Sequence, residues 1–245
     1  FYNMADAVIV GKFVGNKALA AVGSTVSIIA LFVNLLIGAS VGVNVVIAHY
    51  LGLTGHDREI SRTLRTAVTL ALAGGVLLGG VGVLAADAAL RLMSVPADVR
   101  PLALLYVRIY FLGTPFTMLY NYGAAILRAV GDTKRPLVFL IAAGLTNVVL
   151  DLLLVIVIPL GVAGVATGTV ASQMISSILV LRCLYKSEGS YQLRFSKLKI
   201  RWVYLKRIFQ VGIPAGIQST VINFSNALLQ SSVNSFGSTA MAGYT

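Results

Sequence analysis

An acidic side chain interrupts one of the most apolar stretches of this sequence. Asp151 lies within the run from Pro136 to Pro159, whose other residues are almost all hydrocarbon. A carboxylate at the depth of a membrane costs about 3 kcal/mol or more, so it is tolerated mainly where it faces a protein interior or a wet cavity. Asn147 lies four residues earlier, and a helix would place both side chains on one face, about one turn apart. This pair is a candidate for an ion or proton path.

Asp6 is the only other acidic residue well inside an apolar run. Two carboxylates from separate helices that meet in a low-dielectric cavity cannot both stay ionised at low cost, so they would bind a small cation or share a proton. Hard oxygen ligands suit Na⁺, but the residue types do not separate Na⁺ from H⁺ as the ion. Two alternatives remain open: Asp6 could be a headgroup-level charge at a helix start, and Asp151 could pair with an arginine.

The composition indicates an integral membrane protein of the all-α class. Of the 245 residues, 58% are hydrophobic and 11% are charged, whereas a soluble domain carries about 25% charged residues. The mean hydropathy is +0.89. After a short first segment, six apolar runs are long enough to cross a hydrocarbon core of about 30 Å as helices: residues 24–50, 64–86, 101–128, 136–158, 162–185 and 209–235. The sequence therefore predicts a polytopic bundle of seven helices, the first of them truncated.

The net charge of +11 is best explained by membrane orientation. When successive loops are placed on alternate sides of the membrane, fourteen of the 19 Lys and Arg residues fall on one side, and such an excess marks the cytoplasmic face. We expect the loops at residues 51–63, 129–136 and 186–208 to be cytoplasmic in a plasma (inner) membrane protein. The basic residues lie between apolar runs without a nucleic-acid-binding pattern, so the lipid bilayer is the expected partner and nucleic acid is not.

The region after the sixth run divides the chain. Residues 187–209 interleave Trp202, Tyr204 and Phe209 with Lys and Arg, which predicts an amphipathic helix at the inner headgroup layer. A basic protein-binding tail is the alternative. We expect an N-lobe bundle over residues 1–186, a cytoplasmic linker over 187–208, and the start of a C-lobe, a seventh helix and the following turn, over 209–245.

A weak internal repeat supports this division. The sequence GNKALAAVG at residues 15–23 returns as GSTAMAGYT at 237–245, six spans later. An even number of spans gives both copies the same orientation, as in transporters with two parallel lobes. The offset predicts a parent protein of about 440 residues with twelve spans, if each lobe has the same length. Because the chain begins with Phe1 inside an apolar segment, we expect it to start within a helix.

Several motifs resemble one transporter family along essentially the whole chain. They are NMADAVIVGKFVGNKALAAVG from residue 3, ILRAVGDTKRP from 126, TNVVLDLLLV from 146, GVAGVATGTVASQ from 161 and VGIPAGIQST from 211. Together they are similar to the multidrug and toxic compound extrusion (MATE) transporters. The resemblance implies a two-lobe antiporter, a monomer when full length, that exports a small-molecule drug or metabolite, such as an organic cation or another amphiphile, in exchange for Na⁺ or H⁺ by alternating access.

The resemblance also implies a cation or proton site made of Asp6, Asn147, Asp151 and Thr169. Thr167 lies two residues before Thr169 and offers another hydroxyl, so the choice between them stays open. No cofactor is expected besides the coupling ion.

A substrate cavity is predicted from polar and aromatic residues inside the apolar runs, namely Asn34, Tyr120 and Asn121. Such residues also make ordinary interhelical hydrogen bonds and packing contacts. A lipid-linked oligosaccharide flippase of the same wider superfamily is the alternative function, and it would line its cavity with several basic residues. The sequence shows no catalytic constellation, since Cys183 is its single cysteine and no HExxH motif occurs, so an enzyme is not expected.

Overall fold

The computed structural model describes residues 2–53, 55–195 and 198–235. The regular elements in these ranges are helical, which confirms the predicted all-α class. They are α1 (Tyr2–Phe13), α2 (Asn16–Leu51), α3 (Asp57–Leu92), α4 (Arg100–Leu112), α5 (Thr114–Ala129), α6 (Lys134–Leu152), the π-helical turn η1 (Leu153–Val157), α7 (Val162–Lys186) and α8 (Trp202–Ser235). The seven predicted helical segments are all present, with α4 and α5 forming one of them.

Four helices in the described ranges are long and apolar enough to cross a membrane: α2, α3, α6 continued by η1, and α7. The pair α4 and α5 makes a fifth candidate, bent by 46°. The bend lies at Gly113, and Pro115 follows it in the first turn of α5, where the missing proline N–H interrupts the helical hydrogen bonds. Over the residues that are described, neither α1 nor α8 is both long enough and apolar enough to count as a candidate membrane span.

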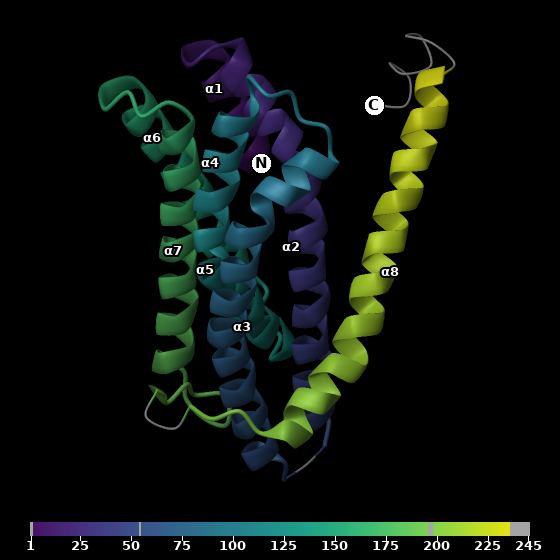
Figure 1. The fold of residues 1–245 in the computed structure, drawn as a ribbon. Helices are drawn as coiled ribbons and strands as arrows, with labels where there is room; N and C mark the ends of the chain where they lie inside the picture. The colour runs from purple at the N-terminus through teal and green to yellow at the C-terminus, as the bar shows by residue number, and fades with distance from the viewer. Residues whose placement is uncertain (1, 54, 196–197, 236–245) are drawn as a thin grey trace.

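The helices α2 to α7 stand side by side as a bundle, with α1 at one end (Figure 1). Large apolar side chains such as Leu84, Leu145 and Val157 are exposed on the outside of this bundle. An exposed apolar surface of this extent is expected where lipid, rather than water, surrounds the protein. In contrast, Asp6, Asn147, Asp151 and Thr169 are buried inside the bundle.

The helix α8 crosses the bundle close to α2 and then leans away from it (Figure 1). Gly38 and Gly42 of α2 lie against Gly212 and Gly216 of α8, and a Cβ atom at Gly42 would collide with the backbone carbonyl of Ile208. Both helices thus carry the GxxxG spacing that lets backbones approach closely in membranes. This contact holds α8 beside α2, and Tyr204 and Arg207 of α8 also contact Tyr50 of α2.

The amphipathic helix predicted over residues 187–209 is wrong in its first part. The backbone is extended at Ser187, Gly189 adopts a positive φ of 88°, and the described residues up to Arg201 form no α-helix. The Leu193 side chain is fully buried, and its N–H bonds the Leu184 carbonyl at 3.0 Å. Burial of this leucine draws the segment back under α7, so the helix begins only at Trp202.

The division into lobes and linker stays a prediction. The second copy of the internal repeat, at residues 237–245, lies outside the described residues.

Candidate ion site and adjoining cavity

The four residues predicted to form the ion site meet inside the bundle. Asp6 comes from α1, Asn147 and Asp151 come from α6, and Thr169 comes from α7; each side chain is at most 1% exposed. The Thr169 hydroxyl donates to Asp6 Oδ2 at 3.1 Å. The Asn147 amide donates to Asp151 Oδ2 at 3.1 Å and to Thr169 Oγ1 at 3.3 Å. Side chains from three helices therefore form one connected network.

Tyr106 of α4 is a member of this network that the sequence did not reveal. Its hydroxyl donates to Asp6 Oδ2 at 2.8 Å, although the two residues are 100 positions apart. The ring is 1% exposed and packs in the apolar cluster that contains Ile9 and Val165. Since a tyrosine in an apolar helix normally packs like any other ring, its position in the sequence gave no signal of this role.

Three acceptor oxygens of the network have no hydrogen-bond donor among the described residues. They are the Oδ1 atoms of Asp6, Asn147 and Asp151. The carboxyl groups of Asp6 and Asp151 are connected through the side chains of Thr169 and Asn147. Buried acceptors are almost always satisfied, and a shared proton or a small hard cation is what satisfies a group of acceptors that lacks donors. This group of oxygen atoms therefore fits H⁺ or Na⁺ as a bound ion.

Both alternatives that the sequence left open for the acids conflict with this geometry. Asp6 is buried and accepts hydrogen bonds from Tyr106 and Thr169, so it is not a headgroup-level charge. For Asp151, no ion pair with an arginine occurs in the described part of the chain.

The choice between the two threonines also follows from the structure. Thr167 is exposed and its hydroxyl bonds the Ala163 carbonyl at 2.7 Å, whereas Thr169 bonds Asp6. Successive residues turn by about 100° around a helix, so two residues two positions apart face nearly opposite directions. Only Thr169 points into the network.

Close contact between α6 and α7 positions Asp151. Gly164 and Gly168 of α7 follow the GxxxG spacing; a Cβ atom at Gly168 would collide with Asp151 Oδ1, and one at Gly164 would lie 3.0 Å from the Leu154 carbonyl. The π-helical turn η1 begins two residues after Asp151. Such turns are rare and are frequent at functional sites, because they shift the register of the helix. Here η1 lies between Asp151 and the end of the apolar run at Pro159.

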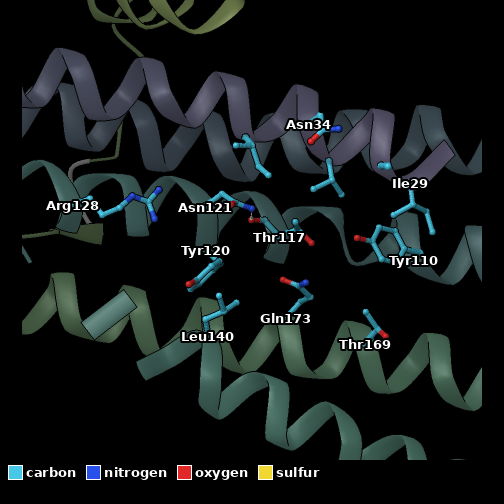
Figure 2. A pocket seen from close by; sticks show the side chains of 13 residues that line it. Ile29, Asn34, Tyr110, Thr117, Tyr120, Asn121, Arg128, Leu140, Thr169 and Gln173 are labelled. Carbon is cyan, nitrogen blue, oxygen red and sulfur yellow. Dashed lines mark hydrogen bonds between the residues drawn. The ribbon is translucent and has the colours of Figure 1, made fainter. Parts of the chain in front are cut away.

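A cavity of about 450 Å³ lies next to the network (Figure 2). Asn34, Tyr120 and Asn121, the predicted cavity residues, all line it, and Thr169 lines it too. Two of the three also make ordinary hydrogen bonds to the backbone. The Tyr120 hydroxyl donates to the Pro136 carbonyl at 2.9 Å, and the Asn121 amide donates to the Thr117 carbonyl at 2.8 Å. Thr169 therefore belongs both to the cavity wall and to the acid network.

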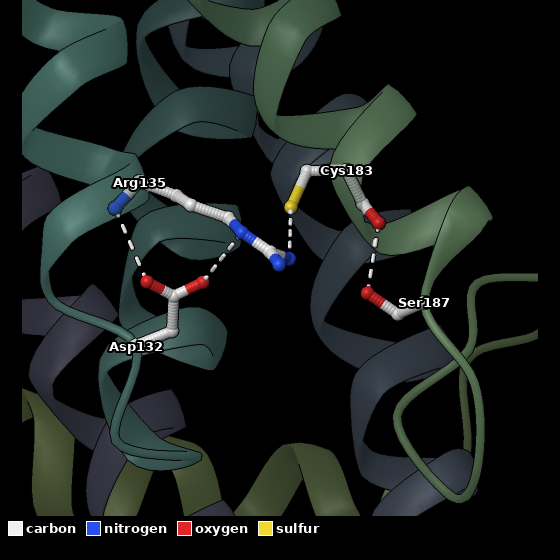
Figure 3. A network of polar contacts seen from close by, with 4 residues as sticks. All are labelled: Asp132, Arg135, Cys183 and Ser187. Atoms are coloured by element: carbon white, nitrogen blue, oxygen red, sulfur yellow. Dashed lines mark hydrogen bonds and ion pairs between the residues drawn. The ribbon is translucent and has the colours of Figure 1, made fainter.

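A second polar cluster, at the ends of α6 and α7, is of an ordinary kind (Figure 3). Arg135 forms an ion pair with Asp132 at 3.3 Å and donates to the Cys183 sulfur at 3.5 Å, while the Ser187 hydroxyl bonds the Cys183 carbonyl at 2.8 Å. The arginine and the aspartate are partly or largely exposed. Exposed pairs of this type contribute little to stability, and this one ties α6 to the end of α7.

The family model MatE matches residues 1–153, more than half of the chain. The chain belongs to the MatE family. Among curated MatE-like relatives, the probable multidrug resistance protein YoeA of Bacillus subtilis (strain 168) is 31% identical over 96% of this chain. The probable multidrug resistance protein YpnP of the same organism is 29% identical over 99% of it.

The chain spans about half the length of these relatives, 52% of YoeA and 54% of YpnP. A crystal structure of MATE in the bent conformation superposes with a TM-score of 0.87 at 25% identity, covering 99% of this chain and 54% of that one. Together with the helices that can cross a membrane, these matches make this MatE chain a multi-pass membrane protein.

Proposed function

We propose that the full-length protein is a secondary active multidrug efflux transporter in the plasma membrane. It exports organic cations or other amphiphilic compounds in exchange for Na⁺ or H⁺ by alternating access, acts as a monomer in the lipid bilayer, and is not an enzyme. The relatives named as multidrug resistance proteins support this class of activity. The ion coupling is proposed because Asp6 and Asp151 are both buried and the Oδ1 atom of each has no hydrogen-bond donor among the described residues.

The geometry suggests how ion binding would act on the lobe. When both acids are ionised they repel each other, and this repulsion is strong in a low-dielectric interior. A proton or Na⁺ removes that repulsion and changes which hydrogen bonds Asp6 accepts from Tyr106 and Thr169. Those bonds connect α1 to α4 and α7. Ion binding therefore favours one packing of α1 over another.

The effect can reach the cargo through two residues of the cavity wall. Thr169 lines the cavity directly. Tyr110 also lines it and stacks on Tyr106, with ring centroids 6.5 Å apart. A ligand shifts a conformational equilibrium only by its difference in affinity for the two states, so a change at these two side chains is sufficient to couple the two sites.

The flippase alternative receives less support from the cavity. It predicts several basic residues on the cavity wall, and the residues described as lining this cavity include a single one, Arg128. Multidrug efflux remains the better interpretation.

The proposal is tested by dye efflux from cells that carry the full-length parent protein. Ethidium and fluorescein are loaded, the Na⁺ and pH gradients are collapsed separately, and wild type is compared with Asp151→Asn and with Asp132→Asn, a control at a partly exposed acid outside the network. We expect at least one dye to leave in a gradient-dependent manner, and export to be lost in Asp151→Asn only. Efflux that persists without either gradient would reject antiport, and full efflux in Asp151→Asn would remove Asp151 from the mechanism.

A further inference from the structure

The ionisable side chains of the cavity and of the acid network differ in type and in exposure. Asp6 and Asp151 are each 0% exposed, so neither carboxylate is presented to a ligand in the cavity. Among the described residues that line the cavity, none is acidic, and the one formal charge belongs to Arg128 on α5. An organic cation would therefore meet no opposite charge on this wall.

Arg128 lies at one end of the cavity, near the end of α5, and Thr169 and Tyr110 lie at the other (Figure 2). The Arg128 side chain is exposed, and neither an ion pair nor a hydrogen bond to it occurs among the described residues. An arginine beside a cavity without an acidic partner is free to bind an anionic group. A guanidinium binds carboxylates with two parallel hydrogen bonds, which gives both affinity and orientation.

Two further polar side chains of the wall are also free to bind a ligand. Asn34 of α2 and Gln173 of α7 line the cavity and make no side-chain hydrogen bond in the described part of the chain. Ile29, Val33 and Ile37 of α2 add apolar surface to the same wall. The wall thus offers one cationic end, two amides and an apolar surface, which is the pattern expected for an amphiphile that carries an acidic group.

We propose that Arg128 is a cargo-binding residue, which takes the carboxylate or another acidic group of an amphiphilic substrate and orients it toward that end of the cavity. This inference rests on the proposed export function and specifies its substrate class. Zwitterions satisfy it as well as anions do, because their positive group can face the end of the cavity near Thr169, behind which the two acids lie.

Two dyes that differ only at the carboxyl group test the proposal. Rhodamine B has a free carboxylate, and rhodamine B ethyl ester has the same ring system and cationic charge with the carboxylate blocked. Binding to the purified full-length protein is measured by fluorescence anisotropy, and export is measured in proteoliposomes. Wild type is compared with Arg128→Gln, with Arg128→Lys, and with Arg182→Gln, which removes an exposed arginine from α7 outside the cavity lining.

We expect wild type and Arg182→Gln to bind rhodamine B about tenfold more tightly than the ester, as a charge-assisted hydrogen bond allows. Arg128→Gln should bind both dyes equally, at the affinity of the ester, and Arg128→Lys should recover part of the difference. Equal binding and export of the two dyes by wild type would overturn the proposal. If that result came with displacement of both dyes by phosphatidylglycerol, Arg128 would be assigned to a lipid headgroup instead.

The outcomes separate this inference from the export function. Gradient-driven export of both dyes with no preference would leave the export function intact and reject the role of Arg128. Failure of wild type to move either dye under any ion gradient would reject both.

Discussion

The acid network and the cavity share Thr169 but differ in burial and in the kind of polar group that they hold. The network holds two carboxyl groups that are fully buried among α1, α4, α6 and α7. The cavity, about 450 Å³ in volume, exposes amides and one guanidinium and has no acidic residue in its described lining. Under the proposed function, the ion and the cargo would therefore bind at separate places. They would not compete for the same carboxylate, and coupling would have to pass through the wall between the two places.

The difference in burial determines which region can act as a switch. Removing a charge from water costs several kcal/mol unless it is paired, so the ionisation or occupancy of Asp6 and Asp151 strongly affects how the helices pack. Arg128 is exposed, so its charge costs little in this conformation. We infer that the network provides the energy of coupling and that the cavity provides the selection of cargo.

Replacing Asp6 by Asn should have the largest effect and should separate the two regions. It removes one of the two charges while keeping the size of the side chain, so no mutual repulsion is left for a cation to relieve. We expect gradient-driven export to fall to the level of empty liposomes, while dye affinity stays within about twofold because Asp6 does not line the cavity. Export at the wild-type rate would mean that the acid pair is not the coupling site.

Replacing Gly168 by Ala should distort the network without changing its chemistry. The new Cβ atom would collide with Asp151 Oδ1, and overpacking of this kind costs about 1–3 kcal/mol. We expect a lower melting temperature and about tenfold slower export. Gly144→Ala is the matched control, because Gly144 lies on α6 with no atom near its Cβ position. Equal effects of the two changes would show that the contact at Asp151 is not special.

Replacing Thr169 or Thr167 tests whether coupling passes through the side chain that the cavity and the acid network share. Thr169→Ala removes the donor to Asp6, and a buried hydrogen bond to a charged group contributes about 1.5–3 kcal/mol. We expect the influence of the ion on dye affinity to fall about tenfold or more, with recovery in Thr169→Ser. Thr167→Ala should behave as wild type, because that hydroxyl only bonds its own helix. Ion-dependent dye affinity would be followed by titration of the purified protein.

Tyr106→Phe should have the smallest effect. The ring stays in place, and Asp6 Oδ2 keeps the hydrogen bond from Thr169, so about 1 kcal/mol is lost and export slows about fivefold. Tyr185→Phe, at an exposed tyrosine of α7, is the control for loss of a hydroxyl. An effect larger than that of Thr169→Ala would shift the main connection to the cavity from Thr169 to the Tyr106 and Tyr110 pair.

The sequence located the acid network well, because an acid or amide in an apolar run is conspicuous. Asp151 and Asn147 stood out by their spacing of four residues, and Asp6 by its isolation. Tyr106 was missed, since an aromatic ring is an ordinary side chain in an apolar helix and does not stand out in the sequence. Arg128 was interpreted only as a topological charge, because the sequence does not show which basic residues border a cavity.

The helices were predicted better than their irregularities. Long apolar runs determine the spans, whereas the bend at Gly113, next to Pro115, and the π-helical turn at Leu153–Val157 both lie inside such runs. The beginning of α8 at Trp202 depends on the burial of Leu193. Hydropathy carries no information about any of these.

The most direct test of ion coupling measures the flux of H⁺ or Na⁺ and the export of dye at the same time. Full-length protein in liposomes exports a dye while a pH indicator and radioactive sodium report the opposing flux, with wild type and Asp151→Asn compared side by side. We expect ion coupling at the acid pair to give a counterflux of H⁺ or Na⁺ that accompanies dye export in wild type and disappears in Asp151→Asn. Dye export without any counterflux, or an unchanged counterflux in Asp151→Asn, would contradict it.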